Sequence, residues 1–273
     1  MTRHTDSRPD AERVSSAATP VLARVAAAIA PLLGEPRAAG TQISQYLNGA
    51  RLVVQESGGD WARVRGPDQY EGWMHRGYLD ESEDVSGHDE RVSLGCVARS
   101  AEGSIRGLPL GALLDAGENA VGGETVRRVE LSVHFPAVGA AIAASALRFF
   151  EGTSYLWGGV TPWGADCSGL VQSIFALHGV PLPRDASDQA RCGVDVAATP
   201  DALMAGDLLI FSDRDDGRVT HVAIAIGDER IVHLALGRGG YAVERLSGGG
   251  DAYVEALRTR IRGARRVIGA VPG

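Results

Sequence analysis

The sequence pattern changes at Pro136, and this change constrains the fold more than any other feature of the chain. Before it, short strand-like runs alternate with Gly-containing turns; after it come two helix-forming segments and then three strand-like runs. Because helices and antiparallel strands follow one another in blocks, the part from 136 to 273 is predicted to be an α+β domain. The chain of 273 residues is long enough for this domain and one or two smaller ones.

The N-terminal part is predicted to form small all-β barrels. In the run WARVR (61–65), Ala62 and Val64 share one face, while polar and aromatic residues share the other. Several short strands at this spacing are typical of a small barrel. The acidic run DESED separates this region from a weaker repeat of the same style. We therefore predict a disordered lead-in over 1–20, a barrel over 21–85 and a second β module over 86–135.

The apolar stretch VLARVAAAIAPLL (21–33) has the composition of a secretory signal but not its organisation. Arg24 interrupts it, acidic residues precede it and no small-residue cleavage site follows. No run approaches the roughly 20 apolar residues that a membrane span requires. We expect a cytoplasmic protein, with export as the alternative.

Cys167 is the candidate nucleophile, at the start of the helix-forming segment CSGLVQSIFALHGV. Asp166 is expected to be the N-cap of this helix. The thiol then lies in the first turn, where partial positive charge and unpaired N–H groups favour a thiolate and can stabilise an oxyanion. The alternative is a buried, unreactive cysteine. The other cysteines, Cys96 and Cys192, form no C-x-x-C pair with it, so neither a disulfide framework nor a structural zinc site is predicted.

Two histidines lie in neighbouring strand-like runs, His221 in VTHVAIAI and His233 in RIVHLAL. A hairpin with the three-residue loop 227–229 places His221 diagonally beside His233 on one face, where small alanines leave room for the cysteine helix. A four-residue loop would put the rings on opposite faces. A nucleophile, a base and a residue that orients the base form the general triad arrangement. His178, at the end of the cysteine helix, is predicted to be a C-terminal cation.

These segments resemble a known family. The stretch YLWGGVTPWGADCSGLVQ (155–172) is similar to the nucleophile motif of the NlpC/P60 cysteine peptidases, and LPRDASDQ, GDLLIF, THVAIAIG and IVHL follow in that family's order. The resemblance covers about residues 138–260. It implies a papain-like α+β fold and a cell-wall peptide as substrate.

The resemblance also assigns site residues. It makes Cys167 the nucleophile, His221 the base and His233 the third member of the triad. It places the hydroxyl of Tyr155 near the oxyanion, with Ser168 beside it.

The N-terminal half is similar to bacterial SH3 (SH3b) modules in the segments IAPLLGEP, SQYLNG, DWARVR and YEGWM. It looks most like the modules that precede γ-D-glutamyl-L-diamino-acid endopeptidases, in which an SH3b wall restricts the site to substrates with a free N-terminal L-Ala. By this resemblance Asp185 pairs with the substrate ammonium and Tyr70 lines the pocket. Asp166 and Arg184 complete the predicted substrate-binding set. Ala50 stands where this subfamily often has a glutamate.

Several of these residues could have a structural role instead of a role in substrate binding. Arg184 is either a contact to a substrate carboxylate or a surface cation. Asp185 is either an amine ligand or the N-cap of the segment ASDQA. Tyr70 and Trp73 are either pocket residues or part of the barrel core.

These features predict a cysteine endopeptidase that hydrolyses the γ-D-glutamyl-L-diamino acid bond of a murein tripeptide or peptidoglycan stem peptide, with no metal or other cofactor. With 27 basic and 34 acidic residues the formal charge is −7, which argues against nucleic acid or an anionic membrane as the main partner. The alternatives are a general peptidoglycan endopeptidase, an amidase or acyltransferase of the same fold, and a non-catalytic module that binds wall fragments.

Overall fold

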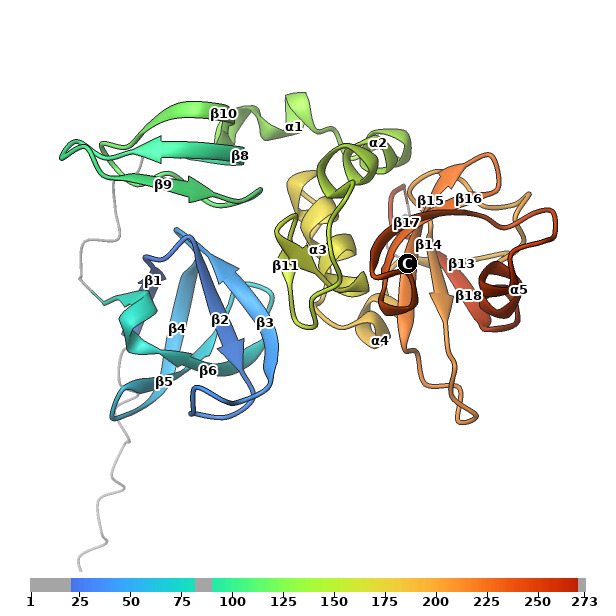
Figure 1. Ribbon diagram of the computed structural model, residues 1–273, viewed down its shortest axis with the longest axis horizontal. Helices are drawn as coiled ribbons and strands as arrows, with labels where there is room; N and C mark the ends of the chain where they lie inside the picture. Colours follow the sequence, from blue (N-terminus) through green and yellow to red (C-terminus); the bar gives the residue numbers. More distant parts are fainter. Residues whose placement is uncertain (1–20, 82–89, 270–273) are drawn as a thin grey trace, which may run out of the picture.

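The computed structural model describes residues 21–81 and 90–269, which form three parts (Figure 1). A barrel of strands lies at the lower left, a three-stranded sheet at the upper left, and a larger domain of helices and strands fills the centre and right. The predicted lead-in, residues 1–20, and most of the acidic run after Asp80 lie outside the described residues.

The N-terminal barrel is a seven-stranded antiparallel sheet with strand order β3-β2-β6-β5-β4-β1-β7. Its elements are β1 Val21–Val25, β2 Ile29–Leu33, β3 Gln42–Leu47, β4 Arg51–Gly58, β5 Trp61–Arg65, β6 Glu71–His75, η1 Arg76–Tyr78 and β7 Leu79–Asp80. Ala62 and Val64 are fully buried in its core, which confirms the predicted alternation in β5. Tyr70 packs at the edge of this core and is only partly buried.

The second β module is a three-stranded antiparallel sheet with strand order β10-β8-β9. Its strands are β8 Arg91–Arg99, β9 Ile105–Leu108 and β10 Asn119–Arg127. It has a small core of its own, in which Cys96 is buried. Asn48 of the barrel fastens the two modules together, because its Nδ2 donates to Leu113 O at 2.7 Å and to Asp115 Oδ1 at 2.9 Å.

The C-terminal domain combines short helices with one large sheet, as predicted for an α+β domain. Its helices are α1 Leu131–His134, α2 Gly139–Phe150, α3 Cys167–Leu177, α4 Ala186–Gln189 and α5 Ala252–Thr259, with the 3₁₀ turns η2 Arg128–Glu130 and η3 Leu236–Arg238. A two-stranded pair, β11 Val160–Thr161 and β12 Gly164–Ala165, precedes α3. The main sheet has the order β13-β18-β14-β15-β16-β17. Its strands are β13 Val194–Val196, β14 Leu208–Phe211, β15 His221–Gly227, β16 Arg230–Ala235, β17 Gly240–Arg245 and β18 Ile261–Arg266.

Helices cover both faces of this sheet. Leu170 of α3 packs in one core with Val222 of β15, whereas Leu257 of α5 packs in another core with Ala223. The cysteine helix therefore lies on the face away from Ala223, and the predicted packing of that helix beside the alanines is wrong. In β15 the residues that alternate with the alanines are Val222 and Ile224, and these pack against α3. Their larger side chains bury more apolar area than an alanine would.

His178 follows α3 but is not the exposed cation that its position suggests. It is buried, and its ring nitrogens contact Pro136 O at 2.7 Å and Ser145 Oγ at 2.9 Å. Burial lowers the pKa of His178 below its ordinary value, which keeps the ring neutral near pH 7. Its function is to join the end of α3 to α2 and to the chain before it.

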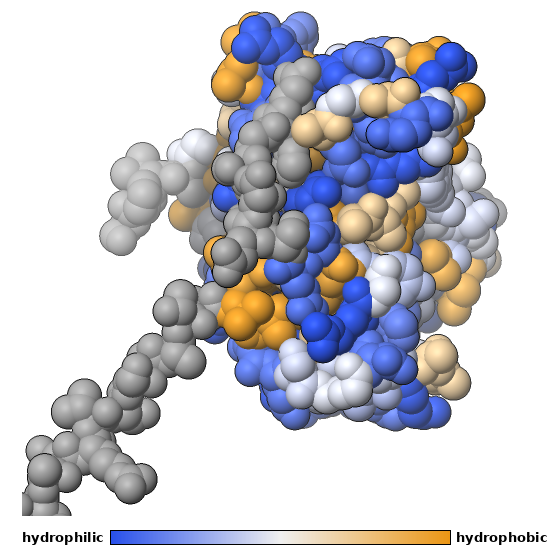
Figure 2. All heavy atoms as spheres, turned by 90° about the vertical axis from the view of Figure 1, so that its left-hand side faces the viewer, coloured by the Kyte–Doolittle hydropathy of each residue, from blue (hydrophilic) through white to orange (hydrophobic). Residues whose placement is uncertain are grey.

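Among the described residues no single helix is long and apolar enough to cross a bilayer. The segments Arg128–His134 and Gly139–Phe150 together have the length and apolar composition of a membrane span, but the chain bends by 109° between them. The face shown in Figure 2 is mainly hydrophilic, and its hydrophobic residues form separate groups. Such scattered apolar residues are ordinary on protein surfaces.

Candidate active site

The candidate nucleophile occupies the first position of α3. Asp166 is the N-cap, as predicted: its backbone is extended, and its Oδ1 accepts a hydrogen bond from Gly169 N at 2.8 Å. Gly169 is required because a Cβ atom there would lie 2.0 Å from Gly159 O. The loop before the helix therefore packs directly on its first turn and fixes where Cys167 points.

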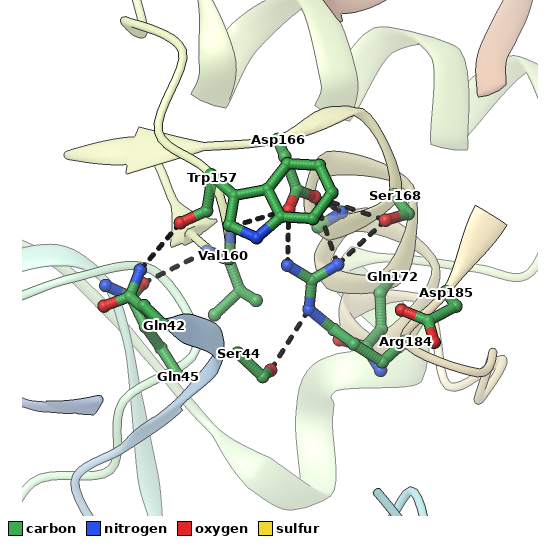
Figure 3. Close-up of polar contacts among 12 residues, drawn as sticks. Gln42, Ser44, Gln45, Trp157, Val160, Asp166, Ser168, Gln172, Arg184 and Asp185 are labelled. Carbon is green, nitrogen blue, oxygen red and sulfur yellow. Dashed lines mark hydrogen bonds and ion pairs between the residues drawn. The ribbon is translucent and has the colours of Figure 1, made fainter. Parts of the chain in front are cut away.

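The N-cap residue Asp166 forms a buried ion pair with Arg184 (Figure 3). Arg184 donates to both oxygens of Asp166, at 3.1 and 2.6 Å, and to Ser168 Oγ at 2.8 Å. Asp166 also accepts from Gly158 N at 2.8 Å and from Ser168 Oγ at 3.2 Å. A carboxylate has about four acceptor positions, so Asp166 is fully used inside the protein. This corrects its predicted role as a substrate ligand.

Arg184 is buried, with 2% of its surface exposed, so the surface-cation alternative is wrong. Burial opposes its charge, but Asp166 outweighs burial and keeps the pKa of the guanidinium above its ordinary value. The hydroxyl of Ser168 is held between these two charges. The Ser168 hydroxyl is therefore not directed at Cys167. The backbone N–H of Ser168 is, and it donates a hydrogen bond to the sulfur of Cys167.

The same arginine reaches the barrel. Its Nε donates to the buried hydroxyl of Ser44 in β3 at 3.1 Å. Two further contacts join β3 to the loop before α3: Gln42 Nε2 donates to Trp157 O at 2.9 Å, and Val160 N donates to Gln45 Oε1 at 3.1 Å (Figure 3). The barrel is thus attached to the segment that carries the nucleophile.

The Cys167 thiol is held neutral in the free protein. Burial, and then the negative charge of Asp166, raise its pKa to about 11. The N–H groups of Val222 and Ser168, which bond to the sulfur, oppose this rise together with Arg184. The N–H groups therefore act in the direction that the sequence predicts, but burial is the larger effect on the pKa of the thiol.

The contact with Val222 places the sulfur beside β15, one residue from His221. Tyr155, in the loop before α3, also lies close to the thiol. Burial, and then the neighbouring Cys167, raise the pKa of Tyr155 to about 12, so its hydroxyl stays protonated and can donate a hydrogen bond. The structure thus brings Tyr155 to the nucleophile, as the sequence resemblance implied.

The two histidines are in contact, as predicted. His221 Nε2 lies 2.8 Å from His233 Nδ1, and His233 is fully buried. Burial, and then His233, lower the pKa of His221 to about 3. The imidazole of His221 is therefore neutral in the free protein, like the thiol of Cys167.

The hairpin that pairs these histidines has the predicted register but a different loop. Ile224 pairs with Val232, as expected. Gly227 pairs with Arg230, so the loop contains only residues 228–229, whose φ angles are positive at 50° and 57°. Such a two-residue turn suits the twist of a hairpin. A bulge just before Gly227 restores the register of the paired strands.

A pocket of about 230 Å³ opens beside His221. Tyr155, His221, Asp213 and Arg260 are among the residues that line it. Thr220 Oγ1 donates to Asp213 Oδ1 at 2.8 Å, which holds the carboxylate near the strand that carries the base. Asp213 and Arg260 were not predicted from the sequence, because both lie outside the recognisable motifs.

Tyr70 and Asp185 meet across the two domains. The Tyr70 hydroxyl lies 3.1 and 3.2 Å from the two carboxylate oxygens of Asp185. Asp185 also occupies the N-cap position of α4, but its side chain makes no capping hydrogen bond. Burial, and then Asp185, raise the pKa of Tyr70 to about 12. Asp185 is therefore more than the N-cap of α4, and Tyr70 is more than a residue of the barrel core, because their side chains contact one another.

Ala50 lies elsewhere. It lines a larger cavity, of about 620 Å³, between the β modules and α3, together with Asp68 and Gln172. Asp185 and Tyr70 do not line that cavity. A carboxylate at position 50 would therefore face this cavity.

Two buried polar residues beside the site were not anticipated. Ser44 was visible only as the first residue of the SQYLNG segment, which says nothing of its contact with Arg184. Glu244 of β17 places Oε1 3.8 Å from His233 Nε2, and it lies beyond every segment that carries the resemblance.

Within the described ranges no group of three or more His, Cys, Asp or Glu residues is arranged to hold a metal ion.

Known proteins are similar to this chain in sequence and in fold. The NlpC/P60 family profile matches residues 152–257, and the bacterial SH3 domain profile matches residues 32–80. A gamma-D-glutamyl-L-lysine dipeptidyl-peptidase of Bacillus subtilis is 32% identical over 214 residues, which cover 70% of this chain and 71% of that protein. A Bacillus cereus protein of the same name is 37% identical over 122 residues, covering 44% of this chain and 34% of that protein.

A crystal structure described as an NlpC/P60 family protein from Bacillus cereus has the same fold. It superposes with a TM-score of 0.74 at 22% sequence identity. The superposition covers 90% of this chain and 99% of that one, so the arrangement of the β modules and the C-terminal domain is shared along nearly the whole length.

The ion pair generates a stability prediction. Arg184→Met leaves the Asp166 carboxylate buried without its partner, which should lower the free energy of unfolding by about 3–5 kcal/mol. Arg191→Met is a matched control, because Arg191 pairs with Asp188 on the exposed surface and its loss should cost less than about 1 kcal/mol. Denaturant unfolding of both variants measures the difference. Equal losses of stability would contradict a structural role for the buried pair.

The raised pKa of Cys167 predicts how the thiol titrates. A thiol whose pKa lies near 11 stays protonated at every lower pH, so the free protein should show no Cys167 thiolate between about pH 5 and about pH 9. The difference in ultraviolet thiolate absorbance between the wild type and Cys167→Ala isolates this group from Cys96 and Cys192. A thiolate signal that appears below neutral pH would instead reveal a preformed thiolate–imidazolium pair.

Proposed function

The chain belongs to the NlpC/P60 family of cysteine peptidases, and we propose that it hydrolyses the γ-D-glutamyl-L-diamino acid bond of murein peptides that carry a free N-terminal L-Ala. The names of the two Bacillus relatives support the bond type. The contact of Tyr70 with Asp185 carries the proposal, because it joins a barrel residue to a carboxylate of the C-terminal domain.

Catalysis begins with a neutral thiol and a neutral imidazole. The proton of Cys167 passes to His221 as the sulfur attacks the γ-carbonyl carbon, so that charge develops only when the oxyanion forms. The N–H groups at the start of α3 that Asp166 does not use, together with the hydroxyl of Tyr155, stabilise that oxyanion. Protonated His221 then gives its proton to the leaving amine. Water, deprotonated by His221, hydrolyses the thioester and frees the thiol.

The substrate amine binds on the barrel side of Cys167. A buried ammonium needs a negative partner, since leaving it unpaired costs several kcal/mol. Asp185 supplies that charge, and the hydroxyl of Tyr70 orients it. We propose that the barrel, which contacts Asp185 through Tyr70, admits one residue beyond the γ-D-glutamate, so that small peptides are favoured over intact wall.

The leaving diamino acid binds on the other side, beside His221. The leaving amine must accept its proton from His221, and the 230 Å³ pocket is lined by that residue. Asp213 at the pocket places a carboxylate within reach of the second amino group of a diamino acid.

We place this reaction in the cytoplasm, as a step in the recycling of murein peptides. The three cysteines are all free, which agrees with a reducing compartment. Small peptides with a free amine are the form in which wall fragments would reach such an enzyme.

Blocking the substrate amine tests the proposal. Acetylation of the L-Ala amine of L-Ala-γ-D-Glu-diamino acid should lower kcat/KM about 100-fold, equivalent to ~3 kcal/mol, because the ammonium loses its pairing with Asp185. Asp185→Asn should slow cleavage of the free-amine substrate far more than cleavage of the acetylated one. Product formation measured by chromatography gives both rates.

Two controls complete this experiment. Asp188→Asn removes a carboxylate from the same short helix, at a surface position, and should leave both rates unchanged. Cys167→Ala should abolish turnover. If the wild type cleaves acetylated and free tripeptides equally well, the barrel does not select the amine, and the protein is a general peptidoglycan endopeptidase.

A further inference from the structure

The inner histidine of the pair has one nitrogen that the triad does not use. Nδ1 of His233 faces His221, whereas Nε2 is fully buried and has no hydrogen-bond partner within the part of the chain that the structure describes. The group facing this nitrogen is the carboxylate of Glu244, whose Oε1 lies 3.8 Å away. A buried, unpaired ring nitrogen is costly unless a neighbour compensates for it.

Strand pairing places Glu244 there. In the antiparallel pair of β16 and β17, Ile231 is opposite Glu244 and His233 is opposite Ala242. Ile231 and His233 point to the same face because side chains alternate along a strand. Glu244 is therefore the diagonal neighbour of His233 on that face.

The carboxylate of Glu244 is buried, ionised and held in place. Its exposed fraction is 7%. Burial raises its pKa, but His233 and Arg238 outweigh burial, so the pKa of Glu244 is lower than its ordinary value. Arg238 donates to its two oxygens at 2.7 and 3.2 Å and also bonds to Asp251 Oδ2 at 2.5 Å.

This geometry determines which tautomer each ring adopts. An ionised carboxylate only accepts hydrogen bonds, so it favours the Nε2–H form of His233. Nδ1 of His233 is then an acceptor and receives the Nε2–H of His221. This leaves the lone pair of His221 on Nδ1, the ring nitrogen that does not face His233. We propose that Glu244 is a positioning residue that acts through His233 to make Nδ1 of His221 the catalytic base.

The negative charge has a second effect. When His221 takes the thiol proton it becomes an imidazolium in a buried setting, where an isolated charge is unfavourable. The carboxylate beyond His233 stabilises that positive charge through the hydrogen-bonded ring between them. Burial and His233 hold the pKa of the free His221 down, and Glu244 limits the cost of protonating it in the transition state.

A spectroscopic measurement tests the tautomers without any substrate. In the wild type labelled with ¹⁵N-histidine, the nitrogen spectrum should show both His221 and His233 as Nε2–H tautomers near pH 7. Glu244→Ala should shift His233 towards the Nδ1–H form. Observation of His233 as the Nδ1–H tautomer in the wild type would overturn the proposal, whatever the substrate of the enzyme proves to be.

Kinetics give the second readout, which rests on the proposed peptidase activity. Glu244→Gln removes the charge at similar volume and should lower kcat about 10- to 100-fold with little change in KM, since it touches no substrate atom. Asp251→Asn is the matched control: it removes the other carboxylate on Arg238, keeps a residue able to cap α5, and should preserve kcat and the nitrogen spectrum. A Glu244→Gln protein that folds and retains kcat within about twofold would overturn the proposal.

Discussion

The buried ion pair of Asp166 and Arg184 is the interaction on which the rest of the site depends. Asp166 caps the helix that begins at Cys167, and Arg184 binds that cap, Ser168 and, through Ser44, the barrel. A buried pair of this kind contributes little net stability compared with apolar residues, but removal of either partner is costly. Its role here is geometric, because one contact network joins the helix that begins at Cys167 to the barrel.

Local rules predicted the parts of the site that depend on neighbouring residues. The N-cap at Asp166 and the diagonal contact of His221 with His233 follow from helix ends and strand alternation. Features that depend on distant packing were not predictable. The burial of Arg184 requires Ser44 from another domain, and the face covered by α3 is decided by which side chains fill the core. The raised pKa of Cys167 likewise reflects burial, which no local motif reveals.

Burial and the neighbouring charges together determine the protonation of Cys167 and His221. Burial keeps the thiol and His221 neutral, so charge appears only with the oxyanion, where helix N–H groups and Tyr155 can stabilise it. The chain of contacts from His221 through His233 to Glu244 runs along the α5 face of the sheet. The ion pair orients the nucleophile from one side, and the carboxylate orients the base from the other.

We infer that the barrel closes the active site of the C-terminal domain, so that free peptides are accepted and intact wall is not. A mass spectrum of products from free L-Ala-γ-D-Glu-diamino acid, recorded beside products from intact peptidoglycan, tests it most directly. We expect L-Ala-γ-D-Glu to be released from the tripeptide, and we expect no cleavage at this bond in intact peptidoglycan, whose L-Ala amine is blocked. Comparable cleavage of intact peptidoglycan would contradict it.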